Sequence, residues 1–137
     1  MKMFELDLLL NKEELKSYSS TALAFVGDAV FALAVKTHVT KEVNAKSGKL
    51  HSIANAYLNA VKQSELLSTL SEELTEEEQA VVNRGRNAYT KNKPKSTDKG
   101  QYQNATALEA LIGYLYLSGQ TDRLEFVLNK VISEVRL

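Results

Sequence analysis

The sequence has no cysteine, one proline and two histidines among 137 residues. Without cysteine the chain can form no disulfide framework, no thiolate metal site and no cysteine nucleophile. A single proline, few glycines and no strictly alternating apolar and polar stretch predict an all-α fold. The formal net charge is zero, so the overall charge indicates no class of partner. The length suits one domain, and we expect residues 1–137 to form it.

The longest apolar run extends from Ala22 to Val35 and has fourteen residues. A membrane span needs roughly 18–20 residues, so this run is expected to be too short to cross a bilayer. The first ten residues carry Glu5 and Asp7 and lack the basic region of a signal peptide. We therefore expect a cytoplasmic protein outside the membrane, which also fits the absence of cysteine.

The same apolar run carries a single acid, Asp28, and we expect the chain to be organised around it. A helix that is apolar on every face is typically buried, and a buried carboxylate is costly unless it is paired or coordinated. Residues 105–117 repeat the pattern with one acid, Glu109. Gly27 beside the first acid and Gly113 one turn after the second would let another helix approach closely. The apolar surplus is hard to bury in one small domain and predicts a dimer.

Two buried helices with one acid each suggest that the two acids share a cation. Without cysteine the ligands would be oxygen atoms, which suit Mg²⁺, or Mn²⁺ in its place. Two carboxylates plus waters are a normal way to hold Mg²⁺. Such an ion orients and activates a water for attack on a phosphodiester and neutralises charge on the phosphate. The alternative is that each acid pairs separately with an arginine, a tyrosine hydroxyl or backbone amides.

Capping residues predict where several helices begin. The cluster at residues 19–21 precedes the first apolar helix, and Asn104 can cap the second. Thr75 and Glu78 match the capping box of a third helix. Residues 89–103 form the longest non-periodic stretch, and we expect a loop there. A loop of that length is more often functional than not.

Basic residues gather between positions 84 and 99. This window holds six of the seventeen basic residues and one of the seventeen acids, so it carries net +5 on a body of net −5. The asymmetry predicts a site for a polyanion, although a solvated lysine-rich loop is the alternative. Three of the candidates, Arg84, Arg86 and Asn87, lie at the end of a predicted helix, and arginine also suits the negative C-terminal end of a helix. The predicted phosphate contacts are Arg84, Arg86, Asn87, Lys91, Lys93, Lys95 and Lys99.

Residues 25–30 (Phe-Val-Gly-Asp-Ala-Val) and 108–113 (Leu-Glu-Ala-Leu-Ile-Gly) resemble the two signature motifs of ribonuclease III endonuclease domains. Both stand in the same order as in that family, and both lie on predicted helices. Residues 49–51, 74–78 and 82–88 resemble Mini-ribonuclease III, a short bacterial branch that lacks a separate domain for binding double-stranded RNA. The resemblance covers nearly the whole chain.

The resemblance implies a helical bundle of the ribonuclease III endonuclease type and a homodimer whose two sites each cut one strand of double-stranded RNA. It implies Mg²⁺-dependent hydrolysis that leaves 5′-phosphate and 3′-hydroxyl ends, with Asp28 and Glu109 as catalytic metal ligands. It further implies maturation of the 23S ribosomal RNA precursor, with a ribosomal protein as helper.

Three positions depart from the motifs of larger relatives: Thr21, Ala24 and Thr106 stand where acids are expected. They favour a second hypothesis, a catalytically weak module of the same fold that binds double-stranded RNA. A third hypothesis is a helical nucleotide pyrophosphohydrolase. Those enzymes usually cluster glutamates on one helix face, whereas residues 76–78 are expected at an exposed helix start. His51 lies near a motif, but a polar helix-start or dimer-surface role is favoured over catalysis.

Overall fold

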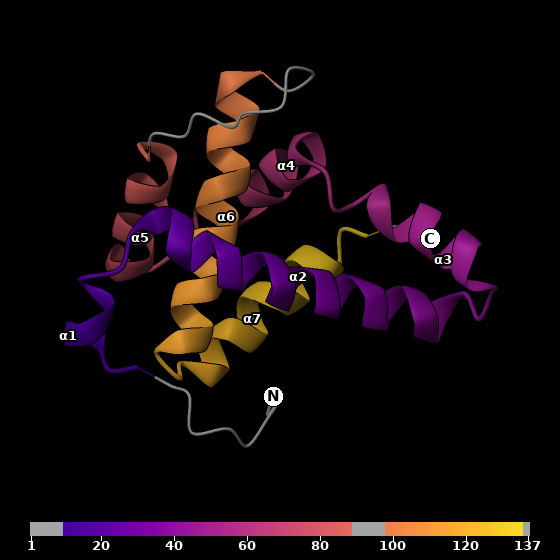
Figure 1. The fold of residues 1–137 in the computed structure, drawn as a ribbon, viewed down its shortest axis with the longest axis horizontal. Helices are drawn as coiled ribbons and strands as arrows, with labels where there is room; N and C mark the ends of the chain where they lie inside the picture. Colours follow the sequence, from indigo (N-terminus) through magenta and orange to yellow (C-terminus); the bar gives the residue numbers. More distant parts are fainter. Residues whose placement is uncertain (1–9, 89–97, 136–137) are drawn as a thin grey trace.

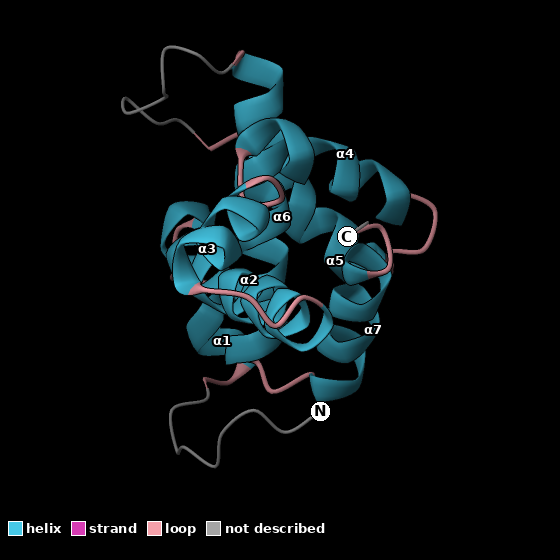
Figure 2. Ribbon diagram, turned by 90° about the vertical axis from the view of Figure 1, so that its right-hand side faces the viewer, coloured by secondary structure: helices cyan, strands magenta, loops and turns pink. Residues whose placement is uncertain are grey.

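The computed structural model describes residues 10–88 and 98–135. Within these ranges the chain forms helices joined by short connections and no strand, so the predicted all-α fold is confirmed (Figures 1 and 2). In chain order the helices are α1 (Lys12–Leu15), α2 (Ser20–Glu42), α3 (Ser47–Asn55), α4 (Ala60–Leu70), α5 (Glu76–Arg86), α6 (Lys99–Leu117) and α7 (Thr121–Ile132).

Helix α6 stands at the centre of the bundle. It packs against α2, α4, α5 and α7, and Figure 1 shows α2 lying across it with α5 and α4 on either side. Its apolar residues are covered from several directions, because neighbouring helices surround it. The sequence alone suggested that the chain is organised around α2. The structure shows instead that it is organised around α6. The buried residues of α6 are Ala105, Thr106, Ala107, Leu108, Ala110, Leu111, Ile112, Gly113 and Leu115.

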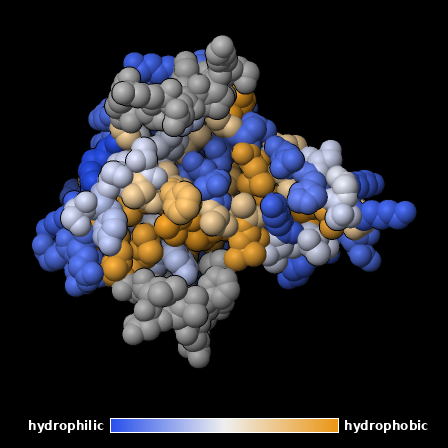
Figure 3. Space-filling view, viewed as in Figure 1, coloured by the Kyte–Doolittle hydropathy of each residue, from blue (hydrophilic) through white to orange (hydrophobic). Residues whose placement is uncertain are grey.

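Helix α2 is buried along one side only. Phe31 and Val35 on that side are fully buried in the core, whereas Phe25 is 82% exposed and Leu33 is 42% exposed. Figure 3 shows apolar surface along the face that α2 presents in Figure 1. The prediction that this run is buried on every face is wrong for a single copy of the chain, because its other helices cover only one side of α2.

Helix α2 is also longer than its apolar run. An 18-residue window of it has a mean hydropathy of 1.5, so by length and composition the helix could cross a membrane. The expectation that it is too short rested on the fourteen apolar residues alone. Yet 39% of that window is buried inside the bundle, where its side chains complete the core around α6. We therefore describe α2 as a core helix.

The helix starts follow the predicted caps in two cases out of three. Ser19 caps α2, and Thr75 with Glu78 forms the capping box of α5. Helix α6, however, begins at Lys99, because the Asp98 carboxylate accepts a hydrogen bond of 2.7 Å from the backbone N–H of Gln101. The expected loop is therefore shorter, and Asn104 lies inside the helix, where its amide is free to bridge neighbouring helices.

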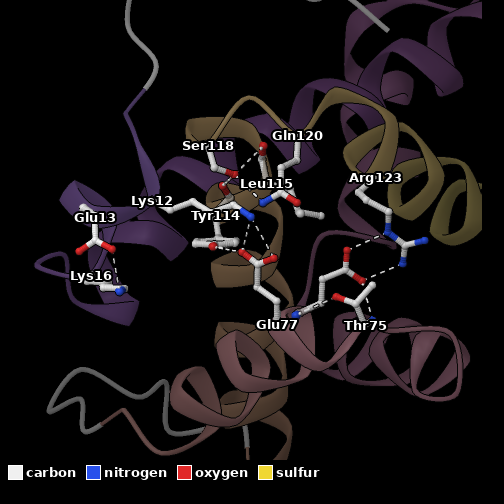
Figure 4. Close-up of polar contacts among 11 residues, drawn as sticks. Lys12, Glu13, Lys16, Thr75, Glu77, Tyr114, Leu115, Ser118, Gln120 and Arg123 are labelled. Atoms are coloured by element: carbon white, nitrogen blue, oxygen red, sulfur yellow. Dashed lines mark hydrogen bonds and ion pairs between the residues drawn. The ribbon is translucent and has the colours of Figure 1, made fainter.

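The last of the three glutamates that begin α5 is buried, contrary to the expectation of an exposed start. Glu78 is 2% exposed, and the Arg123 guanidinium on α7 donates two hydrogen bonds to its carboxylate, of 2.7 and 2.8 Å (Figure 4). Burial acts to raise the pKa of Glu78, but hydrogen bonds from Arg123 and the Thr75 backbone outweigh it and lower that pKa. This ion pair ties α5 to α7.

Candidate active site at the crossing of α2 and α6

The backbones of α2 and α6 touch where the two helices cross. A Cβ atom added to Gly27 would lie 1.7 Å from the carbonyl oxygen of Glu109. A Cβ atom added to Gly113 would lie 1.9 Å from the carbonyl oxygen of Leu23. Both separations are far inside van der Waals contact, so only glycine fits at either position. The close approach predicted from these two glycines is confirmed.

At this crossing the side chain of Asp28 interacts with that of Glu109, through a hydrogen bond and through its charge. Glu109 is partly buried, whereas Asp28 lies on the exposed side of α2. The prediction that Asp28 is buried is therefore wrong for one copy of the chain. The structure nonetheless brings together the two acids that the sequence singled out, and the glycine contact fixes the spacing between their helices.

The two carboxylates interact strongly. Burial, the hydrogen bond to Asp28 and the charge of Asp28 raise the pKa of Glu109 to about 8, while a hydrogen bond from Gln63 acts in the opposite direction. At pH 7 Glu109 is therefore mostly protonated when no cation is present. A positive ion between the two groups would remove the repulsion that keeps this proton in place.

Gln63 is a third member of the site that the sequence analysis missed. Its side chain is 4% exposed, and its Nε2 donates a hydrogen bond of 3.3 Å to Oε2 of Glu109. The spacing of the buried residues in α4 could have revealed it, because a polar residue occupies the first position of an otherwise apolar helix face. The buried residues of that face are Gln63, Leu66, Leu67 and Leu70.

The donor set fits a hard divalent cation. In the part of the chain that the structure describes, no group of three or more histidine, aspartate or glutamate side chains could hold a metal ion. Among the described residues, the candidate protein ligands are therefore the two carboxylates. Mg²⁺ is commonly bound by one or two carboxylates, with waters and substrate phosphates completing its shell. Asp28 and Glu109 meet that requirement, and the exposure of Asp28 leaves room for the remaining ligands.

Comparison with known proteins decides the family. The sequence model of the ribonuclease III domain family matches residues 21–120, which include both signature motifs. Mini-ribonuclease 3 of Staphylococcus aureus is 39% identical over 123 residues, covering 88% of this chain and 92% of the relative. Mini-ribonuclease 3 of Brevibacillus brevis is 43% identical over 113 residues, covering 82% and 84%. The chain belongs to the Mini-ribonuclease III branch of the ribonuclease III family.

A solved structure has a similar fold. The crystal structure of a protein from Fusobacterium nucleatum has a TM-score of 0.78 and 30% sequence identity to this chain. The match covers 88% of this chain and 97% of that one. The enzyme is thus an endoribonuclease of the ribonuclease III type, as its motifs predicted.

Arg86 at the end of α5 of the endoribonuclease contacts α6. Its Nε donates a hydrogen bond of 2.9 Å to Oδ1 of Asn104, whose Nδ2 donates one of 3.0 Å to Oγ of Ser64. Ser64 follows Gln63 in α4, so neighbouring residues of α4 contact Asn104 and Glu109 on α6. Asn104 and Glu109 are five positions apart on α6, which is roughly 7–8 Å along the axis. Arg86 is thereby linked through Asn104 to the same two helices, α4 and α6, that carry Gln63 and Glu109.

Arg84 of the endoribonuclease lies on another side of α5. Its Nη2 donates a hydrogen bond of 3.3 Å to the carbonyl oxygen of Tyr18. It lines a surface cavity of about 340 Å³ together with Lys12 and Lys16. Side chains two positions apart on a helix point in directions that differ by roughly 200°, so Arg84 and Arg86 point to different sides of α5. The structure does not bring the two arginines to one surface.

The remaining candidate phosphate contacts are exposed or lie outside the described residues. Asn87 is the exposed C-cap residue of α5, and Lys99 is the exposed first residue of α6. Lys91, Lys93 and Lys95 fall outside the described residues. The basic candidates that can be placed therefore flank the connection between α5 and α6.

The positions that depart from larger ribonuclease III enzymes supply no further carboxylate. Thr106 is buried in α6, Ala24 is buried in α2, and Thr21 is exposed at the start of α2. His51 is exposed on α3, where it lines a separate cavity of about 170 Å³ between α2 and α3. The candidate ligands of this endoribonuclease remain the two acids.

Proposed function

We propose that the chain is a Mg²⁺-dependent endoribonuclease that cleaves double-stranded RNA in the cytoplasm and matures the 23S ribosomal RNA precursor. One observation carries the proposal: Asp28 and Glu109 lie side by side, partly exposed, in a member of a ribonuclease family. The substrate and the processing step follow from the likeness to the Mini-ribonuclease III branch.

In the proposed mechanism Asp28 and Glu109 would hold the cation. A divalent cation there would supply an activated water for attack on phosphorus and would neutralise charge on the phosphate. Glu109 would have to give up its proton to bind the cation, and the exposure of Asp28 would leave a cation held there accessible to a phosphate. The glycine contact between α2 and α6 keeps the two carboxylates in register during the reaction. Hydrolysis leaves 5′-phosphate and 3′-hydroxyl ends.

Phosphate contacts hold the duplex. Double-stranded RNA is recognised mainly through its shape, its phosphates and its 2′-hydroxyls. Arg86 is suited to this role, because among the described residues its hydrogen bond to Asn104 uses only Nε, and its two terminal nitrogens are donors suited to phosphate. The other proposed contacts are Arg84, Asn87, Lys91, Lys93, Lys95 and Lys99.

A second copy of the chain is the proposed cover for the exposed face of α2. Phe25, Ala29 and Leu33 recur every four residues, so they share one side of the helix, and all three are exposed. A side chain as large and as exposed as Phe25 is typical of an interface. The resulting homodimer would carry two sites, one for each strand, and a ribosomal protein is the proposed helper on the precursor.

The experiment incubates the protein with a labelled RNA duplex and with a panel of nucleotides, in Mg²⁺ or in chelator. The wild type is compared with Asp28→Asn and with Asp122→Asn, an exposed acid on α7. Duplex cleavage that needs both Mg²⁺ and Asp28 supports the proposal, and Asp122→Asn should cleave normally. Binding without cleavage supports the RNA-binding module that Thr21, Ala24 and Thr106 favour. Hydrolysis of nucleotides alone supports a pyrophosphohydrolase.

A further inference from the structure

We propose that Gln63 is a positioning residue for Glu109: its side-chain amide fixes the direction of the Glu109 carboxylate so that the group binds the cation together with Asp28. This inference rests on the proposed function, because it concerns the cation site of that reaction.

The burial of Gln63 is the first observation. Its side chain occupies the first core position of α4, ahead of Leu66 and Leu67, and is 4% exposed. A buried amide is unfavourable unless its hydrogen bonds are made. The Nε2 atom meets this need by donating to Oε2 of Glu109 at 3.3 Å. Gln63 therefore points at the site and not at solvent.

The freedom of Glu109 is the second observation. The contact between Gly27 and Gly113 fixes the backbone of α6 but leaves the long glutamate side chain free to rotate about its own bonds. Asp28, an acid itself, repels Glu109 when both are ionised. The amide of Gln63 is the group that attracts one oxygen of Glu109 and leaves the other available to a cation.

The chemistry of an amide suits this task. A lysine or arginine at position 63 would neutralise Glu109 and compete with a divalent cation for the carboxylates. A neutral N–H donor orients the carboxylate without adding positive charge, as hydrogen-bonding neighbours of metal-binding carboxylates commonly do. Removing such a neighbour typically weakens metal binding about 10–100-fold.

Helix α4 gives Gln63 a fixed base. The backbone N–H of Gln63 donates a hydrogen bond of 2.9 Å to the carbonyl oxygen of Asn59 in the first turn of α4. The next residue, Ser64, accepts a hydrogen bond of 3.0 Å from Asn104 on α6. Because Ser64 joins the same two helices without touching either carboxylate, it provides a matched control.

The test uses Gln63→Met, which keeps the length and unbranched shape of the side chain and removes its donors. The readouts are Mn²⁺ binding to the full-length protein, followed by the electron paramagnetic resonance signal of free Mn²⁺, and the Mg²⁺ concentration for half-maximal cleavage. We expect Gln63→Met to weaken Mn²⁺ binding and to raise the Mg²⁺ requirement, each by about 10-fold or more. Affinity for the RNA duplex in chelator should stay at the wild-type value.

Two further variants separate positioning from packing. Ser64→Ala should lower thermal stability while leaving Mn²⁺ binding unchanged. Gln63→Asn keeps the amide but withdraws it by one methylene, so it should weaken Mn²⁺ binding with little loss of stability. Gln63→Asn also provides the test of the proposal if Gln63→Met does not fold.

The outcomes are distinct. If the Gln63 variants bind Mn²⁺ as tightly as the wild type, or lose only stability, Gln63 is a packing residue and the inference is wrong. Cleavage of the duplex by the wild type in Mg²⁺ tests the proposed function separately. A wild type that binds Mn²⁺ without cleaving RNA would overturn the proposed function, and the comparison of Mn²⁺ affinities would still decide the role of Gln63.

Discussion

Gly27 and Gly113 face each other across the crossing of α2 and α6, and each backbone fills the space where a side chain of the other would begin. The backbone nitrogen of Gly113 lies 2.8 Å from the Cβ position of Gly27, and that of Gly27 lies 3.0 Å from the Cβ position of Gly113. Because Asp28 follows the first glycine and Glu109 lies one turn before the second, this contact sets the geometry of the carboxylate pair.

Replacing either glycine should separate the helices. Gly27→Ala forces a methyl group against a backbone carbonyl, which cannot move without shifting α6. We expect a loss of about 3 kcal/mol or more in the free energy of unfolding, measured with urea. In protein that still folds, cleavage should fall by about 100-fold, since small displacements of catalytic groups are costly.

Gly48→Ala is the control for this prediction. Nothing lies within 4 Å of a Cβ atom at that position, which is near the start of α3. The change should leave stability unaltered or raise it by up to about 1 kcal/mol. Equal stabilities for Gly27→Ala and Gly48→Ala would contradict the close contact.

The raised pKa of Glu109 predicts a pH dependence of stability. The folded state keeps the proton of Glu109 up to about pH 8, whereas the unfolded chain releases it near its usual pKa of 4.5. The stabilising contribution is therefore complete below pH 4.5 and is lost as the pH rises through about 8. In the absence of metal, the wild type should lose stability relative to Glu109→Gln as the pH rises from 4.5 to about 8, because glutamine does not titrate. A constant difference would show that Glu109 titrates normally.

The buried ion pair between Glu78 and Arg123 predicts a strong single-variant effect. Arg123→Met leaves a carboxylate without its partner in the core, so we expect a loss of about 3 kcal/mol at pH 7. Because the pKa of Glu78 is lowered in the folded state, the pair's contribution is present above pH 4.5 and disappears as the pH falls through the folded-state pKa. Urea unfolding of the double variant Glu78→Leu with Arg123→Met should recover most of the loss, and an additive double variant would argue against the pairing.

Salt dependence should distinguish the two arginines of α5. If Arg86 contacts a phosphate, Arg86→Gln weakens duplex binding for all sequences and lowers the slope of log affinity against log salt by about one. Joint neutralisation of Lys91, Lys93 and Lys95 should flatten the slope further. Arg84→Gln should have a smaller effect, because its side chain is turned towards Tyr18. Unchanged affinity and slope in every variant would refute the basic surface.

The exposed face of α2 predicts the oligomeric state. The wild type should be a dimer at micromolar concentration by light scattering, and Phe25→Glu should be a monomer because a charge on this face cannot be buried. Val61→Glu, which changes an apolar residue of α4 that is 43% exposed, is the matched control and should remain dimeric. A monomeric wild type would contradict the proposal.

The sequence predicted the carboxylate pair because an isolated acid in an apolar helix stands out, and because glycines mark close helix contacts. It could not predict that Asp28 is exposed. An apolar pattern does not distinguish a face covered by the same chain from a face left for another copy. The sequence therefore identified the residues of the site better than their surroundings.

Two other features depend on how each helix is rotated and placed against its neighbours, which the composition does not determine. Gln63 emerges as part of the site only when α4 is placed against α6. The partners of Arg84 and Arg86, which are Tyr18 and Asn104, appear only when the rotation of α5 is known. The start of α6 was misplaced because Asp98 and Asn104 are both good capping residues. Tertiary contacts, not local preference, decide between them.

Helix α6 also limits how the length of this enzyme can change. It contacts α4 and α5 through the Asn104 side chain, α4 and α2 around Glu109, and α2 again through the backbone at Gly113. One inserted residue inside this span would turn everything beyond it by roughly 100° and advance it by about 1.5 Å. No neighbouring helix could follow such a turn without losing its own contacts. Insertions and deletions are therefore expected to be tolerated between helices and eliminated within α6.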